Sequence, residues 1–153
     1  MITEDYVSFE TAKLLKEKGF KHWCYKSYGD AVYYKGVSIS FDEECDLKSE
    51  GLENEIEYVE GGYLYDFGCD NRKKDAKVWA APTLWVAMKW LREVHSLYLD
   101  IVTSFSQDGI CYTFSCSNVM DLIQGTKGTS YNEYQTYEEA AEAAIKYCLE
   151  NLI

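Results

Sequence analysis

Two histidines and one cysteine are the residues whose types could support catalysis. His22 lies two positions before Cys24, and alternate residues of a β-strand share one face. An imidazole beside a thiol can withdraw the thiol proton and activate the sulfur as a nucleophile. No neighbouring residue in the sequence would orient His22, so a strand that carries both side chains without catalytic purpose is the favoured interpretation.

His95 closes an apolar-periodic segment that is expected to be a helix. An imidazole at a helix C-terminus interacts favourably with the last carbonyl groups, and this role is favoured over that of a general base. None of the six cysteines falls in a C-x-x-C pair, so zinc has little support. The sequence therefore predicts no catalytic residue, no metal ligand and no cofactor.

Acidic residues are concentrated in the segment 42–60. It holds nine carboxylates and a single base, Lys48, and so carries −8 of the net charge of −11. Oxygen ligands from Asp42 to Asp46 could hold a hard cation, but the spacing and the glycine of an EF-hand are absent. A solvated loop is favoured for Asp42 to Asp46. The alternation from Leu52 to Tyr58 is compatible with an edge strand whose charges block unwanted strand pairing.

Tyrosines near this segment suggest a surface for protein binding. Fourteen residues of the chain are tyrosines, and several fall on the expected strands. Exposed tyrosines suit interfaces because they bury a large rigid area at low entropic cost, although sheet packing is the simpler explanation. The candidate interaction surface comprises Asp42, Glu43, Glu44, Asp46, Glu53, Glu55, Glu57, Tyr58, Tyr63 and Tyr65.

Length and charge limit the class of protein. A chain of 153 residues with 47% hydrophobic residues fits a single domain, here residues 1–153 with an acidic insert at 42–60. The net negative charge opposes binding to phosphate backbones and to anionic lipid. No apolar run reaches the ~18 residues of a membrane span, and the N-terminal residues are acidic. A cytoplasmic protein with reduced thiols is expected.

Three segments carry the signals of helices. The first begins at Ser8, a good N-cap residue, and ends before Gly19. The second begins at Pro82 and places apolar residues, including Leu91, on one face, which Trp85 and Trp90 widen. The third opens with the capping box Thr136-x-x-Glu139. The second and third helices are expected to supply most of the core.

Alternating apolar residues predict two hairpins. The first spans residues 23–41 with a turn at Tyr28-Gly29-Asp30, and the second spans 99–114 with a turn at Gln107-Asp108-Gly109. Together with the helices they predict an α+β fold, an antiparallel sheet of about five to six strands with three helices. The expected order is α-ββ-(β)-α-ββ-α.

Three blocks of the sequence resemble small uncharacterised proteins of phages and prophages of Bacteroidetes. They are Tyr6–Leu15, Ala81–His95 with its string Trp90-Leu91-Arg92-Glu93-Val94-His95, and Tyr137–Ile153. The resemblance implies an origin in a mobile element and a compact fold. It implies no activity and transfers no catalytic residue.

The sequence is compatible with three functional classes. A non-enzymatic interaction or accessory protein is favoured, with a basic protein as partner and nucleic-acid mimicry as one version. A small enzyme that uses Cys24 and His22, or His95, is the first alternative. A nucleic-acid-binding domain is the least favoured, because the net charge opposes it.

Overall fold

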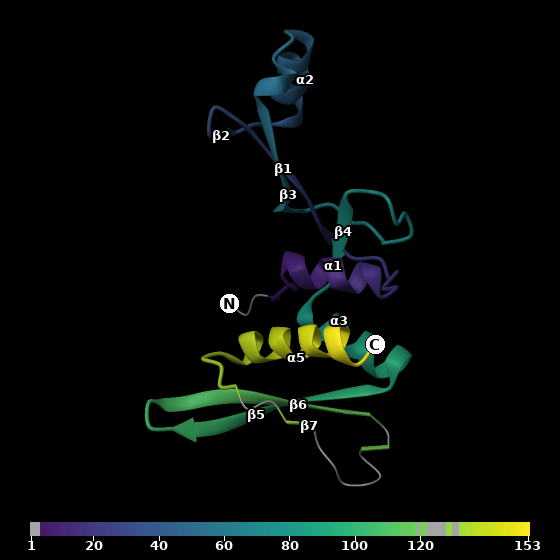
Figure 1. Cartoon of the computed structure of the whole chain (residues 1–153), viewed down its shortest axis with the longest axis vertical. Helices are drawn as coiled ribbons and strands as arrows, with labels where there is room; N and C mark the ends of the chain where they lie inside the picture. Colours follow the sequence, from purple (N-terminus) through teal and green to yellow (C-terminus); the bar gives the residue numbers. More distant parts are fainter. Residues whose placement is uncertain (1–3, 119, 122–127, 130–131) are drawn as a thin grey trace.

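The chain folds into a body that carries a long projecting arm (Figure 1). This computed structural model describes residues 4–118, 120–121, 128–129 and 132–153. Within them, helices and antiparallel strands alternate, so the α+β class is confirmed. The strands form two sheets and not the single sheet that was expected. One has the order β2-β1-β3, with β4 also paired to β1, and the other has the order β5-β6-β7.

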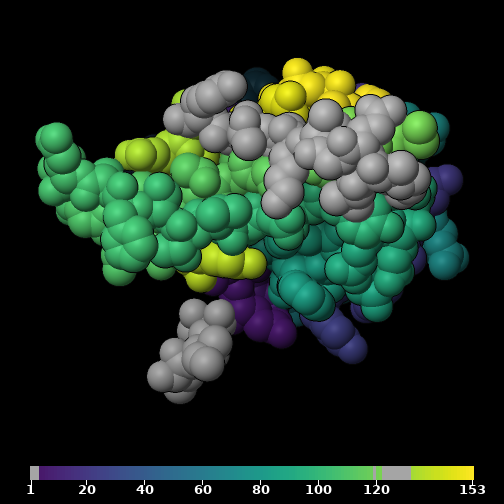
Figure 2. Space-filling view, turned by 90° about the horizontal axis from the view of Figure 1, so that it is seen from below, coloured from purple at the N-terminus to yellow at the C-terminus, as the bar shows by residue number. Residues whose placement is uncertain are grey.

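A three-stranded sheet forms one end of the body. β5 (Leu97–Ser106) and β6 (Gly109–Asn118) pair along their whole length, from Leu97↔Asn118 to Ser106↔Gly109, which confirms the second predicted hairpin. β7 (Gly128–Thr129) adds two residues to β6. The turn end of the β5–β6 hairpin protrudes beyond the helices (Figure 2).

Three helices lie between the two sheets, and each begins at a side-chain cap. They are α1 (Phe9–Glu17), α3 (Leu84–His95) and α5 (Tyr137–Asn151). The hydroxyl groups of Ser8, Thr83 and Thr136 each accept a backbone N–H from three residues further on. α3 therefore begins two residues after the predicted start at Pro82, because Thr83 and not the proline defines its first turn.

The core is formed where these helices meet each other and the sheets. It contains Leu15 of α1, Leu91 of α3 and Ile145 of α5, all fully buried, together with Trp79, Trp90 and Phe114. Among the described residues, α3 and α5 contribute nine of its nineteen buried members, slightly less than the majority that was expected. In the described part of the chain, no helix is long and apolar enough to cross a membrane.

The arm is formed by residues 32–59. It comprises the distal halves of β1 (Lys26–Tyr34) and β3 (Ile56–Tyr65), the short β2 (Val37–Ser38), the helix α2 (Phe41–Ser49) and the 3-10 turn η1 (Glu53–Glu55). All of these residues are described, and Ile56 is the only buried one. The arm extends away from the helices, with α2 at its far end (Figure 1).

At the joint between the arm and the body, neighbouring strands and side chains pack closely against the backbones of β1 and β3. The proximal half of β1 pairs with β4 (Val78–Ala81) on one side and with β3 on the other. The pairing with β3 is irregular between Gly29 and Ala31. At Gly61 of β3 the backbone has φ +63°, and the Phe9 ring of α1 occupies the space that a Cβ would need.

Three expectations for the first half of the chain are wrong. The edge strand begins at Ile56 and not at Leu52, because Glu53–Glu55 form the 3-10 turn η1. Tyr28-Gly29-Asp30 is not a turn but the middle of the continuous strand β1, and the chain turns instead at Lys35 and Gly36. Gly29 serves close packing, because a Cβ there would lie 2.9 Å from the Tyr65 ring. The segment from Asp42 to Asp46 is not a loop but part of α2, a helix beyond the three expected.

Candidate functional site

The arm carries most of the predicted interaction surface. Asp42, Glu43, Glu44 and Asp46 lie on α2, Glu53 and Glu55 on η1, and Glu57 and Tyr58 on β3. α2 forms because Ser40 and Glu43 make a reciprocal capping box, with three acidic residues in the positive first turn. The helix thus folds by local interactions, and it has no buried residue. Asp42 and Asp46 are exposed, whereas the Glu44 side chain is only 12% exposed.

One cluster ties α2 to β3. The Tyr58 hydroxyl donates to the Glu44 carboxylate at 2.6 Å, and the Lys48 ammonium lies 2.7 Å from the same carboxylate. The hydrogen bond from Lys48, with that from Tyr58, lowers the pKa of Glu44. The same contact with Glu44 raises the pKa of Tyr58. Lys48, the only base of the segment 42–60, is therefore already paired within the arm.

Tyr63 and Tyr65 lie on the part of β3 nearer the body. Their ring centroids are 4.7 Å apart, and the centroid of the Tyr65 ring lies 5.2 Å from that of the Phe67 ring. The Tyr65 hydroxyl donates to the backbone carbonyl of Asp30 at 2.7 Å, and burial raises its pKa. Tyr65 is thus a packing residue, whereas Tyr63 is 55% exposed and remains available at the surface.

Apolar side chains are exposed among the acids of the arm. Phe41 is 76% exposed, Val37 65% and Tyr58 45%, although each could contribute to a core. Tyr58 is partly covered by Glu44 and Lys48, whereas Phe41 and Val37 lie mostly in solvent. Burial of such side chains against a partner would remove apolar surface from water, which is the main driving force of association.

The residues of the first enzymatic alternative are not arranged for nucleophilic catalysis. Cys24 is 5% exposed, and its thiol donates to the backbone carbonyl of His22 at 3.6 Å rather than to the imidazole. Burial raises the pKa of Cys24 to about 12, so the thiolate is disfavoured. The His22 ring instead packs against the Phe20 ring, with 5.5 Å between the two ring centroids. This arrangement gives a Cys/His nucleophile no support.

His95 packs against the body rather than capping α3. Its ring meets Trp90 edge-on at 4.6 Å, and its Nε2 is buried with no hydrogen-bond partner in the structure as described. Burial lowers the pKa of His95. The helix ends instead at Ser96, whose left-handed backbone allows its N–H to bond to the Leu91 carbonyl.

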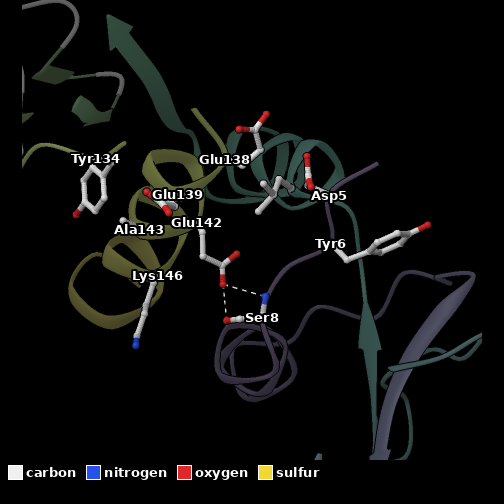
Figure 3. Close-up of a pocket in the computed structure, with 10 residues that line it drawn as sticks. Asp5, Tyr6, Ser8, Tyr134, Glu138, Glu139, Glu142, Ala143 and Lys146 are labelled. Atoms are coloured by element: carbon white, nitrogen blue, oxygen red, sulfur yellow. Dashed lines mark hydrogen bonds between the residues drawn. The ribbon is translucent and has the colours of Figure 1, made fainter. Parts of the chain in front are cut away.

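A pocket of about 530 Å³ lies where the starts of α1, α3 and α5 converge (Figure 3). The Glu142 carboxylate of α5 reaches the start of α1, where Oε1 accepts the Ser8 N–H at 2.9 Å and the Thr11 hydroxyl at 2.6 Å. It also accepts the Ser8 hydroxyl. Glu142 therefore caps α1 from another helix, and its Oε2 is buried without a partner among the described residues.

An adjoining pocket of about 520 Å³ is lined by both aromatic and acidic side chains. It shares Asp5, Leu84 and Glu138 with the first pocket. Its aromatic side chains are Tyr25, Trp85 and Tyr137, which are 84%, 65% and 46% exposed. Trp85 was expected to widen the core-facing side of its helix, but it lies at this surface while Trp90 is buried.

These two pockets are candidate sites that sequence patterns did not indicate. Asp5, Trp85 and Glu138 are far apart in the chain, and each belongs to a pattern with an ordinary explanation. Acids in the first turn of a helix, such as Glu138, stabilise the helix dipole. The one available signal was Trp85, a large aromatic residue displaced by one position from the apolar stripe of its helix.

Comparison with known proteins yields no relative. No protein-family model, curated protein or solved structure matches the chain. Among the described residues, no group of three or more histidine, cysteine, aspartate or glutamate side chains could hold a metal ion.

Proposed function

We propose that this chain is a non-enzymatic interaction protein that binds a basic protein through its acidic arm. The observation that carries the proposal is the combination of clustered carboxylates with exposed Phe41, Val37 and Tyr58 on one ordered projection. Charge complementarity would steer a basic partner to the arm, and the apolar side chains would supply contact area.

The arm contributes little to the core, which also supports a binding role. None of residues 32–59 belongs to the buried core cluster. A segment of this size would be dispensable for the fold of the body, because its helix and hairpin fold on local interactions. A partner that covers Phe41 and Val37 gives a physical reason for their exposure.

The resemblance to phage and prophage proteins adds a biological origin to this proposal. We place the chain among the accessory proteins of a phage or another mobile element, acting in the cytoplasm. If the arm mimics nucleic acid, its partner would be a protein that binds nucleic acid through a basic surface, and DNA would compete with the arm for that surface.

Replacement of the arm tests the proposal. Tyr34 of β1 pairs with Ile56 of β3, so residues 35–55 can be replaced by Asn-Gly, which favours a two-residue hairpin turn. The replacement removes seven acidic residues and two lysines, hence five net negative charges, and takes the net charge from −11 to −6. We expect affinity for poly-L-lysine, measured by calorimetry, to fall at least about tenfold.

A matched variant separates the arm from net charge. Five exposed acids of the body are neutralised to reach the same net charge: Glu17→Gln, Glu93→Gln, Asp100→Asn, Asp108→Asn and Glu150→Gln. This variant should retain most of the affinity for poly-L-lysine. Equal loss in both variants would show that binding depends on total charge and would refute the role of the arm.

A double substitution on α2 tests the same surface without removing the arm, and it is needed if the chain with the replaced arm does not fold. Phe41→Ser combined with Asp46→Asn leaves the capping box of α2 intact, because neither residue takes part in it. Affinity should fall while thermal melting of the body is unchanged. Retained affinity in this variant would exclude α2 as the contact surface.

A further inference from the structure

We propose that the pocket of Tyr25, Trp85 and Tyr137 binds an arginine side chain of a partner polypeptide. The site lies on the body, at the starts of α3 and α5, and is separate from the arm. Its volume of about 520 Å³ exceeds what one side chain fills, so flanking apolar residues of the partner would also be accommodated.

The electrostatics of the pocket favour a cation. Glu4, Asp5 and Glu138 line it, and no lysine or arginine is among its described lining residues. In the adjoining pocket Glu142 is engaged at the start of α1, and Lys146 pairs with Glu10 at 2.6 Å. Asp5 and Glu138 have no side-chain hydrogen bond or ion pair within the described residues, so their carboxylates are free to bind a ligand.

The walls of the pocket favour a guanidinium group in particular. Trp85, Tyr25 and Tyr137 all line this pocket, and all three present aromatic surface to solvent. A guanidinium group stacks on aromatic faces and is more weakly hydrated than an ammonium group. It also donates two parallel hydrogen bonds to a carboxylate, which a lysine cannot do. Arginine is among the residues enriched at protein interfaces.

The dipoles of α3 and α5 do not explain why aromatic side chains are exposed in this pocket. The N-termini of α3 and α5 would stabilise Asp5 and Glu138 without any ligand. Helix capping, however, needs no exposed tryptophan, and Leu84 and Met88 of α3 could pack equally well beside a small residue at position 85. The coincidence of unpaired acids with exposed aromatic rings is what indicates a ligand.

Titration with matched peptides tests this site directly. A blocked pentapeptide with a central arginine flanked by leucines is added to the full chain labelled with ¹⁵N. The Trp85 indole N–H signal, identified by its loss in Trp85→Phe, reports occupancy. The same peptide with citrulline, a neutral isostere of arginine, should bind at least about tenfold more weakly.

Paired variants distinguish the pocket from total charge. Asp5→Asn with Glu138→Gln should weaken binding of the arginine peptide by about tenfold or more, whereas Asp108→Asn with Glu150→Gln, two exposed acids elsewhere, should leave it unchanged. Thermal melting confirms that each variant is folded. The chain with residues 35–55 replaced by Asn-Gly should bind the peptide as well as the unmodified chain does.

Three results would overturn the proposal. Equal binding of the citrulline peptide would show that no cation is recognised. Equal binding of a lysine peptide would remove the preference for guanidinium. If blocked arginine alone shifted the Trp85 signal with the same affinity as the peptide, the ligand would be a small guanidinium compound rather than a segment of a partner.

Discussion

The body and the arm of this chain are stabilised by different kinds of interaction. In the body, α1, α3 and α5 bury Leu15, Leu91 and Ile145 completely between two sheets. In the arm, α2 has no buried residue and β3 buries only Ile56 at its start, before it reaches the body. The body is therefore held by long-range apolar contacts, whereas the arm is held by a capping box, a hairpin and the Glu44–Lys48–Tyr58 cluster.

This difference separates stability from recognition. Apolar burial contributes most of the free energy of folding, so the body carries the stability of the chain. The arm holds carboxylates and apolar side chains in solvent, where they add little to stability but are available to a partner. Segments of low local stability are commonly those that serve binding.

The largest expected effect concerns the core. Leu91→Ala removes a fully buried side chain from α3 and should lower the free energy of unfolding by about 2–5 kcal/mol. The same substitution at the half-buried Leu47 of α2 should cost less than about 1 kcal/mol. Urea denaturation of both variants measures the difference. Similar costs would mean that the arm shares in the core.

The joint between the two regions should show an intermediate effect. Gly61→Ala adds a Cβ where the Phe9 ring lies and also strains a backbone at φ +63°, so a cost of about 1–3 kcal/mol is expected. Gly36→Ala is the matched control, because its φ is +77° but no atom lies within 4 Å of the added Cβ. Differential scanning calorimetry should show the larger drop in Tm for Gly61→Ala.

The smallest expected effect is the pH dependence of α2. The folded-state pKa of Glu44 is lowered, chiefly by the hydrogen bond from Lys48. Its contribution is therefore present above the unfolded pKa and is lost as the pH falls through the folded pKa. NMR shifts of α2 should move towards coil values only as the pH falls below the ordinary glutamate pKa of about 4.3.

A substitution at the same position supplies the control for that titration. Glu44→Gln should shift part of the α2 population towards coil at neutral pH and flatten the acid response of the Tyr58 ring signals. Shifts of the core residues, such as those around Ile145, should not follow this titration. An unchanged acid response in Glu44→Gln would assign the effect to the other carboxylates of the helix.

Local signals predicted much of the fold correctly. Ser8 and Thr136 cap helices as expected, and Gln107-Asp108-Gly109 closes the second hairpin. These features depend on residues within a few positions of one another. The glycine at position 29 misled the prediction, because a glycine needed for close approach to Tyr65 has the same sequence signature as one needed for a turn.

Composition and short-range patterns thus determined the acidic character, the α+β class, the main helices and the concentration of charge in residues 42–60. Only the tertiary structure decided that this segment stands on an arm, that the strands divide into two sheets, and that Asp5, Trp85 and Glu138 line one pocket. Capping and periodicity are encoded between near neighbours, whereas the pocket and the arm depend on which distant segments pack together and which are left in solvent.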